Sequence, residues 1–191
     1  MKNIYIVLLH YPVYNKKGDV ITTAVTNMDI HDISRSAKTY GIKRFYIVTP
    51  VEEQRELVRR IIRHWQRGYG ASYNPLRKEA MDIVDLKGTL EEVLEDISAE
   101  TKNKVRLVLT GAGLRGKLTK FAELKRSMAK SQNPCLLVFG TGWGIVREVI
   151  DDADFFLEPI EGPSNYNHLS VRSAVAVVLD RLLGERGVRK K

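Results

Sequence analysis

A short segment near the start of the chain combines two carboxylates with a guanidinium group. Asp29, Asp32 and Arg35 lie close together in sequence, and on a helix residues three or four apart share a face. Carboxylates can accept protons and arginine can bind anions, so this set suits acid–base chemistry on an anionic substrate. The alternative is an amphipathic helix, capped by Asn27 or Asp29, whose exposed face carries an ordinary ion pair between Asp32 and Arg35.

Two glycine-containing stretches have the character of ligand-binding loops. The first follows the apolar run 135–139 and contains three alternating glycines, Gly140, Gly142 and Gly144. The second follows an apolar run that ends at Thr110. Because glycine has no Cβ, a ligand can lie directly against the main chain at such positions. Both stretches are therefore candidate walls of one binding site.

Two nucleotide motifs compete for these glycines. The segment Gly111 to Lys117 matches the phosphate-binding P-loop up to its last position, where Leu118 replaces the hydroxyl residue that holds magnesium. A P-loop-like nucleotide-binding protein is therefore the weaker interpretation. The segment Gly140 to Gly144 lacks the spacing of the dinucleotide fingerprint, and no acidic residue follows at a strand end about 20 positions later. A nicotinamide site is not expected.

Alternating strands and helices must position these loops. We expect strands at 3–9, 44–49, 80–86, 105–110, 135–139 and 155–157, with 20–26 a strand or an extended segment. We expect helices at about 27–40, 52–67, 89–98, 117–129, 145–150 and 169–183, and an irregular loop at 67–78. This alternation predicts an α/β fold, with a mostly parallel sheet and helices on both faces, in a single domain over 1–191. The carboxyl ends of such strands are where ligands bind.

Two of these elements carry further information. The continuous apolar content of 3–9 predicts a strand in the centre of the sheet. The last helix is apolar on most of its circumference, so it must be buried in the core or against a second copy of the protein.

Basic and aromatic residues indicate a polyanion as partner. The net charge is +8, with 31 lysines and arginines against 23 acidic residues, and clustered cations gain affinity from phosphates by releasing counterions. One cluster is the loop 10–18, which mixes tyrosines and lysines that can stack on bases and attract phosphate. Another is the stripe formed by Arg59, Arg63 and Arg67 at i, i+4, i+8 spacing. Both clusters also fit an ordinary solvated surface.

Several classes of protein are not expected. The longest apolar runs are far shorter than the about 20 residues of a membrane helix, and residues 1–3 lead straight into a strand without a signal-peptide cleavage pattern. We therefore expect a cytoplasmic location and no membrane. Cys135, the one cysteine, has no partner at zinc-site spacing and is expected to be a small buried residue, with no disulfide and no metal site.

A third loop, Leu157 to Ala174, runs from a strand through a proline-stiffened segment into the last helix. Together with the two glycine stretches it resembles the SPOUT superfamily of S-adenosylmethionine-dependent RNA methyltransferases. The Arg35 segment is similar to the first motif of that family, Phe139 to Ile145 to the second, and Leu157 to Ala174 to the third. The resemblance implies a C-terminal trefoil knot, S-adenosyl-L-methionine as cofactor, RNA rather than DNA as substrate, and a homodimer through the knot and the last helix.

The resemblance also implies which residues bind. Main-chain groups of the three loops would surround the cofactor, at Thr110, Gly111, Ala112, Gly140, Thr141, Gly142, Gly144, Ile160, Gly162, Ser164, Asn165, Tyr166, Asn167, Leu169 and Ser170. The residues expected to contact RNA are Tyr11, Tyr14, Lys16, Lys17, Arg35, Arg63 and Arg67.

The methylated atom stays open between a ribose 2′-hydroxyl and a base nitrogen, on tRNA or ribosomal RNA. In this superfamily a first-motif arginine serves ribose methylation, and Arg35 matches it, but Met28 and Asp29 stand where an asparagine is expected. Arginine hardly deprotonates, so Arg35 is expected to orient RNA and Asp29 or Asp32 to act as catalytic base. The alternative is a non-catalytic knotted RNA-binding protein.

Overall fold

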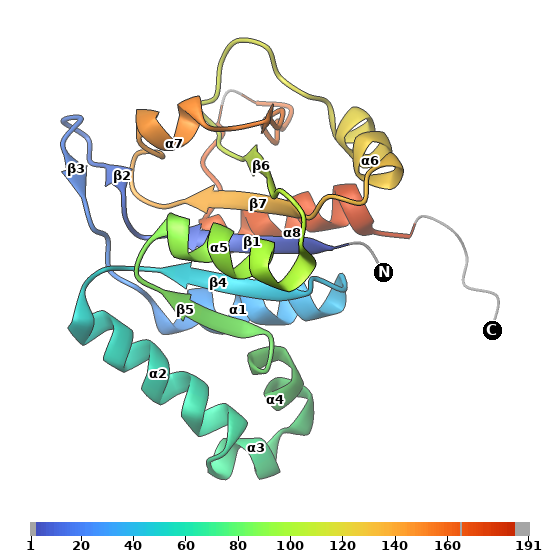
Figure 1. Ribbon diagram of the computed structural model, residues 1–191. Coiled ribbons are helices and arrows are strands. Elements are labelled where there is room, and N and C mark those ends of the chain that lie inside the picture. Colours follow the sequence, from blue (N-terminus) through green and yellow to red (C-terminus); the bar gives the residue numbers. More distant parts are fainter. Residues whose placement is uncertain (1–2, 165, 186–191) are drawn as a thin grey trace.

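The computed structural model describes residues 3–164 and 166–185, and its centre is a parallel sheet with the strand order β5-β4-β1-β7-β6-β8 (Figure 1). These strands are β1 Ile4–Leu9, β4 Arg44–Val48, β5 Val84–Lys87, β6 Arg106–Leu109, β7 Cys135–Gly140 and β8 Phe155–Phe156. β1 pairs with β4 and with β7, so that Ile6 lies between Phe45 and Leu137. The predictions of a mostly parallel sheet and of a central first strand are confirmed.

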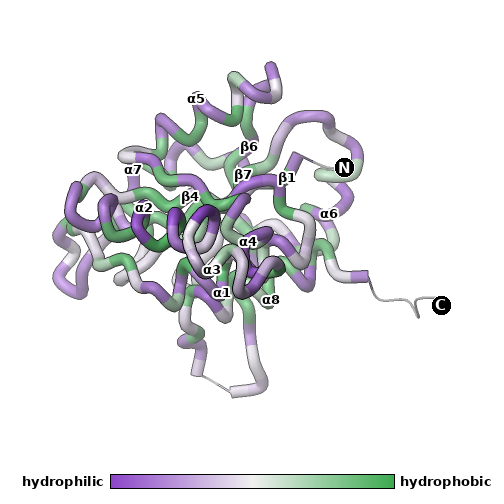
Figure 2. Tube along the Cα trace, turned by 90° about the horizontal axis from the view of Figure 1, so that it is seen from below, coloured by the Kyte–Doolittle hydropathy of each residue, from purple (hydrophilic) through white to green (hydrophobic). Residues whose placement is uncertain are grey.

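Helices cover both faces of this sheet (Figures 1 and 2). One face packs against α1 (Asn27–Thr39), α6 (Phe121–Lys130) and α8 (Val171–Leu183), and the other against α5 (Leu90–Thr101) and α7 (Arg147–Asp151). Successive strand residues point to opposite faces, so Ile6 joins the first core and Val7 the second. Both faces are buried, which explains why the strands are apolar throughout rather than alternating.

Two smaller units lie outside these layers. Strands β2 (Val13–Tyr14) and β3 (Val20–Ile21) form an antiparallel hairpin in the loop after β1. Helices α2 (Glu52–Gln66), α3 (Tyr69–Tyr73) and α4 (Pro75–Met81) pack together beyond the β5 edge, next to α1 (Figure 1). None of the described helices is long and apolar enough to cross a membrane.

Some predicted boundaries were wrong, each for a local reason. The N-cap of α1 is Thr26, whose hydroxyl accepts the Asp29 amide, rather than Asn27 or Asp29. The predicted irregular loop 67–78 contains α3 and the start of α4. The Asn74 cap and Pro75 in the first turn start α4 inside that predicted loop. The helix runs to Met81, so the following strand begins at Val84 instead of residue 80.

Two further helices start later than expected. α6 begins at Phe121 instead of residue 117, because Thr119 forms an extended bridge with Leu157. α8 begins at Val171 instead of residue 169, because the Ser170 hydroxyl accepts the Ser173 amide and caps it. The burial predicted for Cys135 is confirmed, at 2% exposure.

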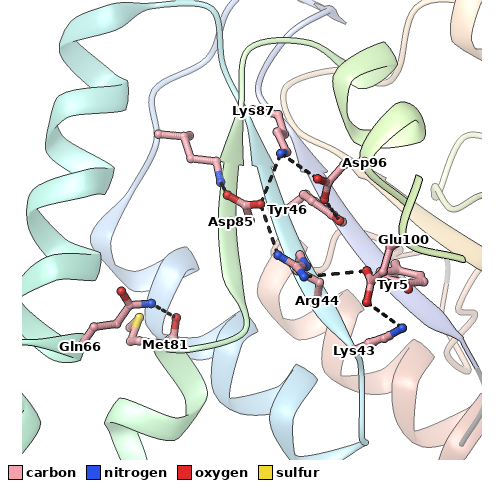
Figure 3. Close-up of polar contacts among 11 residues, drawn as sticks. Tyr5, Lys43, Arg44, Tyr46, Gln66, Met81, Asp85, Lys87, Asp96 and Glu100 are labelled. Atoms are coloured by element: carbon pink, nitrogen blue, oxygen red, sulfur yellow. Dashed lines mark hydrogen bonds and ion pairs between the residues drawn. The ribbon is translucent and has the colours of Figure 1, made fainter. Parts of the chain in front are cut away.

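A network of charged groups ties α5 to β1, β4 and β5 (Figure 3). Its members are Tyr5, Lys43, Arg44, Tyr46, Asp85, Lys87, Asp96 and Glu100. At its most buried point the Tyr46 hydroxyl donates to Asp96 at 2.6 Å, and the Lys87 ammonium lies 3.3 Å from the same carboxylate. Burial alone would raise the pKa of Asp96, but these two partners outweigh it and lower that pKa. The network therefore fixes α5 on this face of the sheet.

Candidate functional site

The carboxyl ends of β1, β7 and β6 are neighbours in the sheet, so the loops that leave them lie side by side. These loops are 10–26 after β1, 141–146 after β7 and 110–120 after β6. The fold thus brings the two glycine stretches to one edge, as the strand pattern predicted. It also adds the β2–β3 hairpin to that edge, which the sequence did not place.

The hairpin packs directly on the glycine loop after β7. The Tyr14 amide donates to the Gly144 carbonyl, and the Trp143 amide donates to the Tyr14 carbonyl, both at 2.8 Å. Gly142 has a φ of +60°, and a Cβ there would lie 2.8 Å from the Tyr14 oxygen, so its missing side chain makes room for the hairpin. At Gly144, with a φ of +123°, a Cβ would meet nothing within 4 Å. Of these two glycines, Gly144 is the one with open space at the Cβ position.

A relay of hydrogen bonds joins three of these segments beneath the loops. The Thr141 hydroxyl donates to the Leu9 carbonyl at 2.9 Å, so it accepts from the Thr23 hydroxyl at 2.5 Å. Thr23 then accepts from His10 Nδ1 at 3.0 Å. This direction places the imidazole proton on Nδ1 and leaves Nε2 as an acceptor. Within the described chain, the buried Nε2 has no hydrogen-bond partner.

His10 is neutral in this position. Its side chain follows the last residue of β1 and is only 1% exposed. Burial lowers the pKa of His10 to about 4, and the nearby Asp29 carboxylate offsets this only in part. The sequence interpretation missed His10 as a site residue, although a histidine at the carboxyl end of a central strand was a visible signal.

The predicted catalytic carboxylates are joined to α8. One oxygen of Asp29 accepts the Thr26 hydroxyl at 2.6 Å, and the other lies 3.3 Å from Arg172 Nη1. The Nε of the same arginine lies 3.6 Å from Asp32. The expected pair between Asp32 and Arg35 is therefore not formed. Arg35 is exposed and has no ion pair with any residue that the structure describes.

Arg172 was missed because it is distant in sequence from α1, and only the packing of α1 on α8 brings it to these carboxylates.

The loop after β6 leaves its glycines open but does not form a P-loop. Gly111, Ala112 and Gly113 are exposed, and the Thr110 hydroxyl points back to donate to the Val138 carbonyl at 2.9 Å. A P-loop requires a helix to begin at the glycine loop so that its amides face the phosphates. Here a loop of turns and bends, with one bridge at Thr119, intervenes up to α6 at Phe121. The phosphate-loop interpretation is therefore wrong.

The third loop starts next to the second and then leaves the body of the protein. The Glu158 carboxylate accepts the Phe121 amide at 2.8 Å, and Ile160 packs on the core. Residues 161–164 and 166–170 are exposed, and the loop projects beyond α8 (Figure 2). These ranges hold the expected cofactor residues Gly162, Ser164, Tyr166, Asn167, Leu169 and Ser170. Asn165 lies outside the described residues.

No hydrogen bond between described residues joins 161–170 to the glycines of the other two loops. The joint cofactor site of all three loops stays a prediction.

Apart from Arg35 on α1, the residues expected to contact RNA fall into two places. Tyr11, Lys16 and Lys17 are exposed on the loop after β1, where the Lys16 ammonium lies 5.8 Å from the ring centre of Trp143. The Tyr14 hydroxyl is engaged by the Arg147 amide at 3.3 Å. Trp143 itself is 67% exposed, and the sequence interpretation missed it as a contact. Arg63 on α2 and Arg67 at its C-cap line a separate groove described below.

Comparison with protein families gives one match over most of the chain. Residues 3–184 match a family described as SAM-dependent RNA methyltransferase. A protein of Aquifex aeolicus, named only as uncharacterized, is 44% identical over 181 residues, which cover 95% of this chain and 88% of that protein. A tRNA (guanine-N(1)-)-methyltransferase of Oleidesulfovibrio alaskensis is 41% identical over 184 residues. The chain spans only 43% of the length of that relative.

Solved structures share the fold at low sequence identity. A probable methylase family protein from Haemophilus influenzae has a TM-score of 0.60 at 20% identity, covering 95% of this chain and 65% of that chain. The TrmH/SpoU tRNA modifying enzyme of Aquifex aeolicus has a TM-score of 0.57 at 15% identity, covering 96% of this chain and 75% of that chain. These similarities confirm the predicted fold class of the sheet and its helices.

Proposed function

The chain belongs to the SAM-dependent RNA methyltransferase family, and we propose that it methylates tRNA with the methyl donor bound at the carboxyl ends of β1, β7 and β6. One observation carries the placement of this site: two exposed glycine loops lie on the ends of neighbouring strands, β7 and β6. The relative named for tRNA favours tRNA over ribosomal RNA. Because that name describes a protein more than twice as long, its guanine specificity does not transfer, and the methylated atom is left to experiment.

The residues at this edge fit S-adenosyl-L-methionine, which supplies a methyl group on a sulfonium when bound. The exposed main chain at 111–113 and at Gly144 offers amide donors and carbonyl acceptors for an adenine edge. His10 Nε2 is a buried acceptor that still lacks a donor within the described chain. We propose that the exposed third loop supplies the remaining wall, with Ile160 as its apolar base.

The residues of α1 divide the remaining work. We propose that Arg35, which is exposed and has no described ion pair, orients an RNA phosphate or ribose. Both oxygens of Asp29 are already engaged, by Thr26 and Arg172, so Asp29 is better suited to position α8 than to accept a proton. Asp32 has a half-exposed side chain and a single long contact, and it is our candidate base.

We further propose a single domain whose C-terminal segment forms the trefoil knot, in a cytoplasmic homodimer. Apolar side chains near the joined ends of α1 and α8 support this assembly, because Met28 is 59% and Leu169 46% exposed. The oligomeric state is measured by analytical ultracentrifugation. A monomer at micromolar concentration would remove the homodimer from the proposal.

Methyl transfer from radiolabelled S-adenosylmethionine to bulk tRNA and ribosomal RNA tests the activity. The RNA should come from a strain that lacks the protein, so that the site is unmodified. We expect label in tRNA, and nuclease digestion then separates ribose from base methylation. Arg35→Ala should keep donor affinity in calorimetry and lose transfer by about 100-fold or more. Unchanged turnover of this variant would remove Arg35 from the mechanism.

The second candidate function is RNA binding without catalysis. It is favoured by the contacts of Asp29, an ion pair with Arg172 and a hydrogen bond from Thr26, which leave few free bases at the site. Binding of both the donor and RNA, together with absence of label in every RNA fraction, would establish this alternative.

A further inference from the structure

An open groove of about 950 Å³ lies between α1, α2 and α4, on a different part of the protein from the glycine loops. Arg60 and Arg63 line it from α2, Arg67 lines it from the C-cap of that helix, and Arg77 lines it from α4. Arg60 and Arg63 are three apart and share one face of α2, and Arg67 follows four residues later at the C-cap. The predicted stripe is thus corrected at one position: Arg59 pairs with Glu52, and Arg60 takes its place in the groove.

The arginines of this groove have no carboxylate partner among the described residues. None of its four arginines forms an ion pair with a described residue, and no acidic residue lines the groove. By contrast, Arg55 and Arg59, on the same helix, both pair with Glu52. Guanidinium groups gathered without carboxylates favour a bound anion.

Aromatic and imidazole rings form the floor of the groove. The Trp65 ring packs edge-on against His31 and His64, and the Arg77 guanidinium lies 4.8 Å from its centre. The Nδ1 atom of His31 is buried without a hydrogen-bond partner in the described structure. Burial and, next, the charge of Arg77 lower the pKa of His31, which is consistent with a positive field here.

Exposed rings continue from one end of the groove. Gly68 lines the groove, and the next residue, Tyr69, stacks on Tyr73 with ring centres 5.8 Å apart. These tyrosines are 76% and 73% exposed. A cationic groove that leads to exposed rings is the combination that binds single-stranded nucleic acid, through phosphates and base stacking.

We propose that this groove binds a single-stranded segment of the RNA substrate, with Arg60, Arg63 and Arg67 on successive phosphates and Tyr69 and Tyr73 stacking on bases. Residues four apart on a helix are separated by about 6 Å along the axis, which suits neighbouring phosphates of one strand. The open shape suits a polymer better than an enclosed small molecule. The proposal rests on the proposed function for the identity of the polymer, but the groove and the methyl-donor site share no residue.

The test measures binding of a fluorescent oligouridylate by anisotropy over a range of salt concentrations. Arg63→Gln/Arg67→Gln should weaken binding on the order of 10-fold and reduce the slope of log K against log salt by about 1.4, from about 0.7 per phosphate contact. The matched control, Lys125→Gln/Arg126→Gln on α6, removes the same charge from exposed positions outside the groove. It should change the slope little.

Fluorescence localises the contact. Trp65 and Trp143 are the 2 tryptophans of the chain, so in a Trp143→Phe background the emission reports on the groove. Oligouridylate should quench Trp65 there, and the quenching should require Arg63 and Arg67. Equal slopes for the groove and control variants, or no change in Trp65 emission, would overturn the proposal.

Calorimetry with S-adenosylmethionine distinguishes this failure from failure of the proposed function. If the groove variants have no effect on oligouridylate binding while donor binding is normal, the groove proposal is refuted and the proposed function stands. If donor binding is absent while the groove variants weaken oligouridylate binding, the proposed methyl-donor site is refuted and the groove proposal stands.

Discussion

The relay beneath the glycine loops makes the stability of the fold depend on the protonation of His10. Nδ1 of His10 donates to Thr23, and Nε2 is buried without a partner in the described chain, so a second proton on this ring would be buried with little compensation. The pKa of His10 falls from 6.5 to about 4 on folding. Between these values the unfolded chain binds more protons than the folded chain, so the free energy of unfolding decreases as the pH falls.

The size of this effect follows from the shift. Each pKa unit corresponds to about 1.4 kcal/mol, so full acidification through the window should remove about 3 kcal/mol of stability. His10→Asn keeps an N–H donor near Thr23 but cannot titrate. Its stability should therefore fall less steeply over the same window, although it loses packing at neutral pH.

Urea unfolding followed by circular dichroism at a series of pH values measures this difference. The lowered pKa of His31 contributes to both proteins and cancels in the comparison. Parallel curves for the wild type and His10→Asn would refute the assignment of a neutral, buried His10.

Two further substitutions test the framework around the site. Gly142→Ala should cost about 1–2 kcal/mol in urea unfolding, because an alanine at a φ of +60° is strained and its Cβ meets the Tyr14 carbonyl; Gly113→Ala, where a Cβ meets nothing within 4 Å, is the control and should be nearly neutral. Tyr46→Phe should cost about 1 kcal/mol by removing the hydrogen bond to Asp96, and it should raise the pKa of Asp96 measured by NMR. Full stability of either variant would show that its contact contributes nothing.

The sequence predicted the sheet well because its strands are buried on both faces. A short continuous apolar run followed by glycines, such as 135–139, is best explained as a buried strand. Because helices separate these strands along the chain, a parallel sheet is the arrangement that fits them all. Boundaries were harder where a side chain decides them. Asn74 turned a predicted loop into α4, and the bridge of Thr119 to Leu157 delayed α6. Such choices depend on contacts that no periodicity reveals.

Of the candidate site, only the positions of its main-chain loops could be predicted from the sequence. The glycine loops could be placed from strand ends, whereas the partners of Asp29 and Asp32 could not, since Arg172 comes from the far end of the chain. The basic stripe was nearly right, but Glu52 decides which arginine is neutralised. Pairing between charged side chains depends on tertiary geometry, and spacing along a helix gives only candidates.

The strand order has a consequence for how the chain assembles during synthesis. β1, β4 and β5 come from the first part of the chain and β6, β7 and β8 from the later part, and the seam between them is the pairing of Ile4–Leu9 with Cys135–Gly140. Until β7 leaves the ribosome, the edge of β1 that pairs with β7 in the folded protein is unpaired. Such an apolar edge can pair with other chains. The N-terminal half of the chain therefore exposes an unpaired strand edge until the second half has been synthesised. We expect fragments that end before β7 to aggregate.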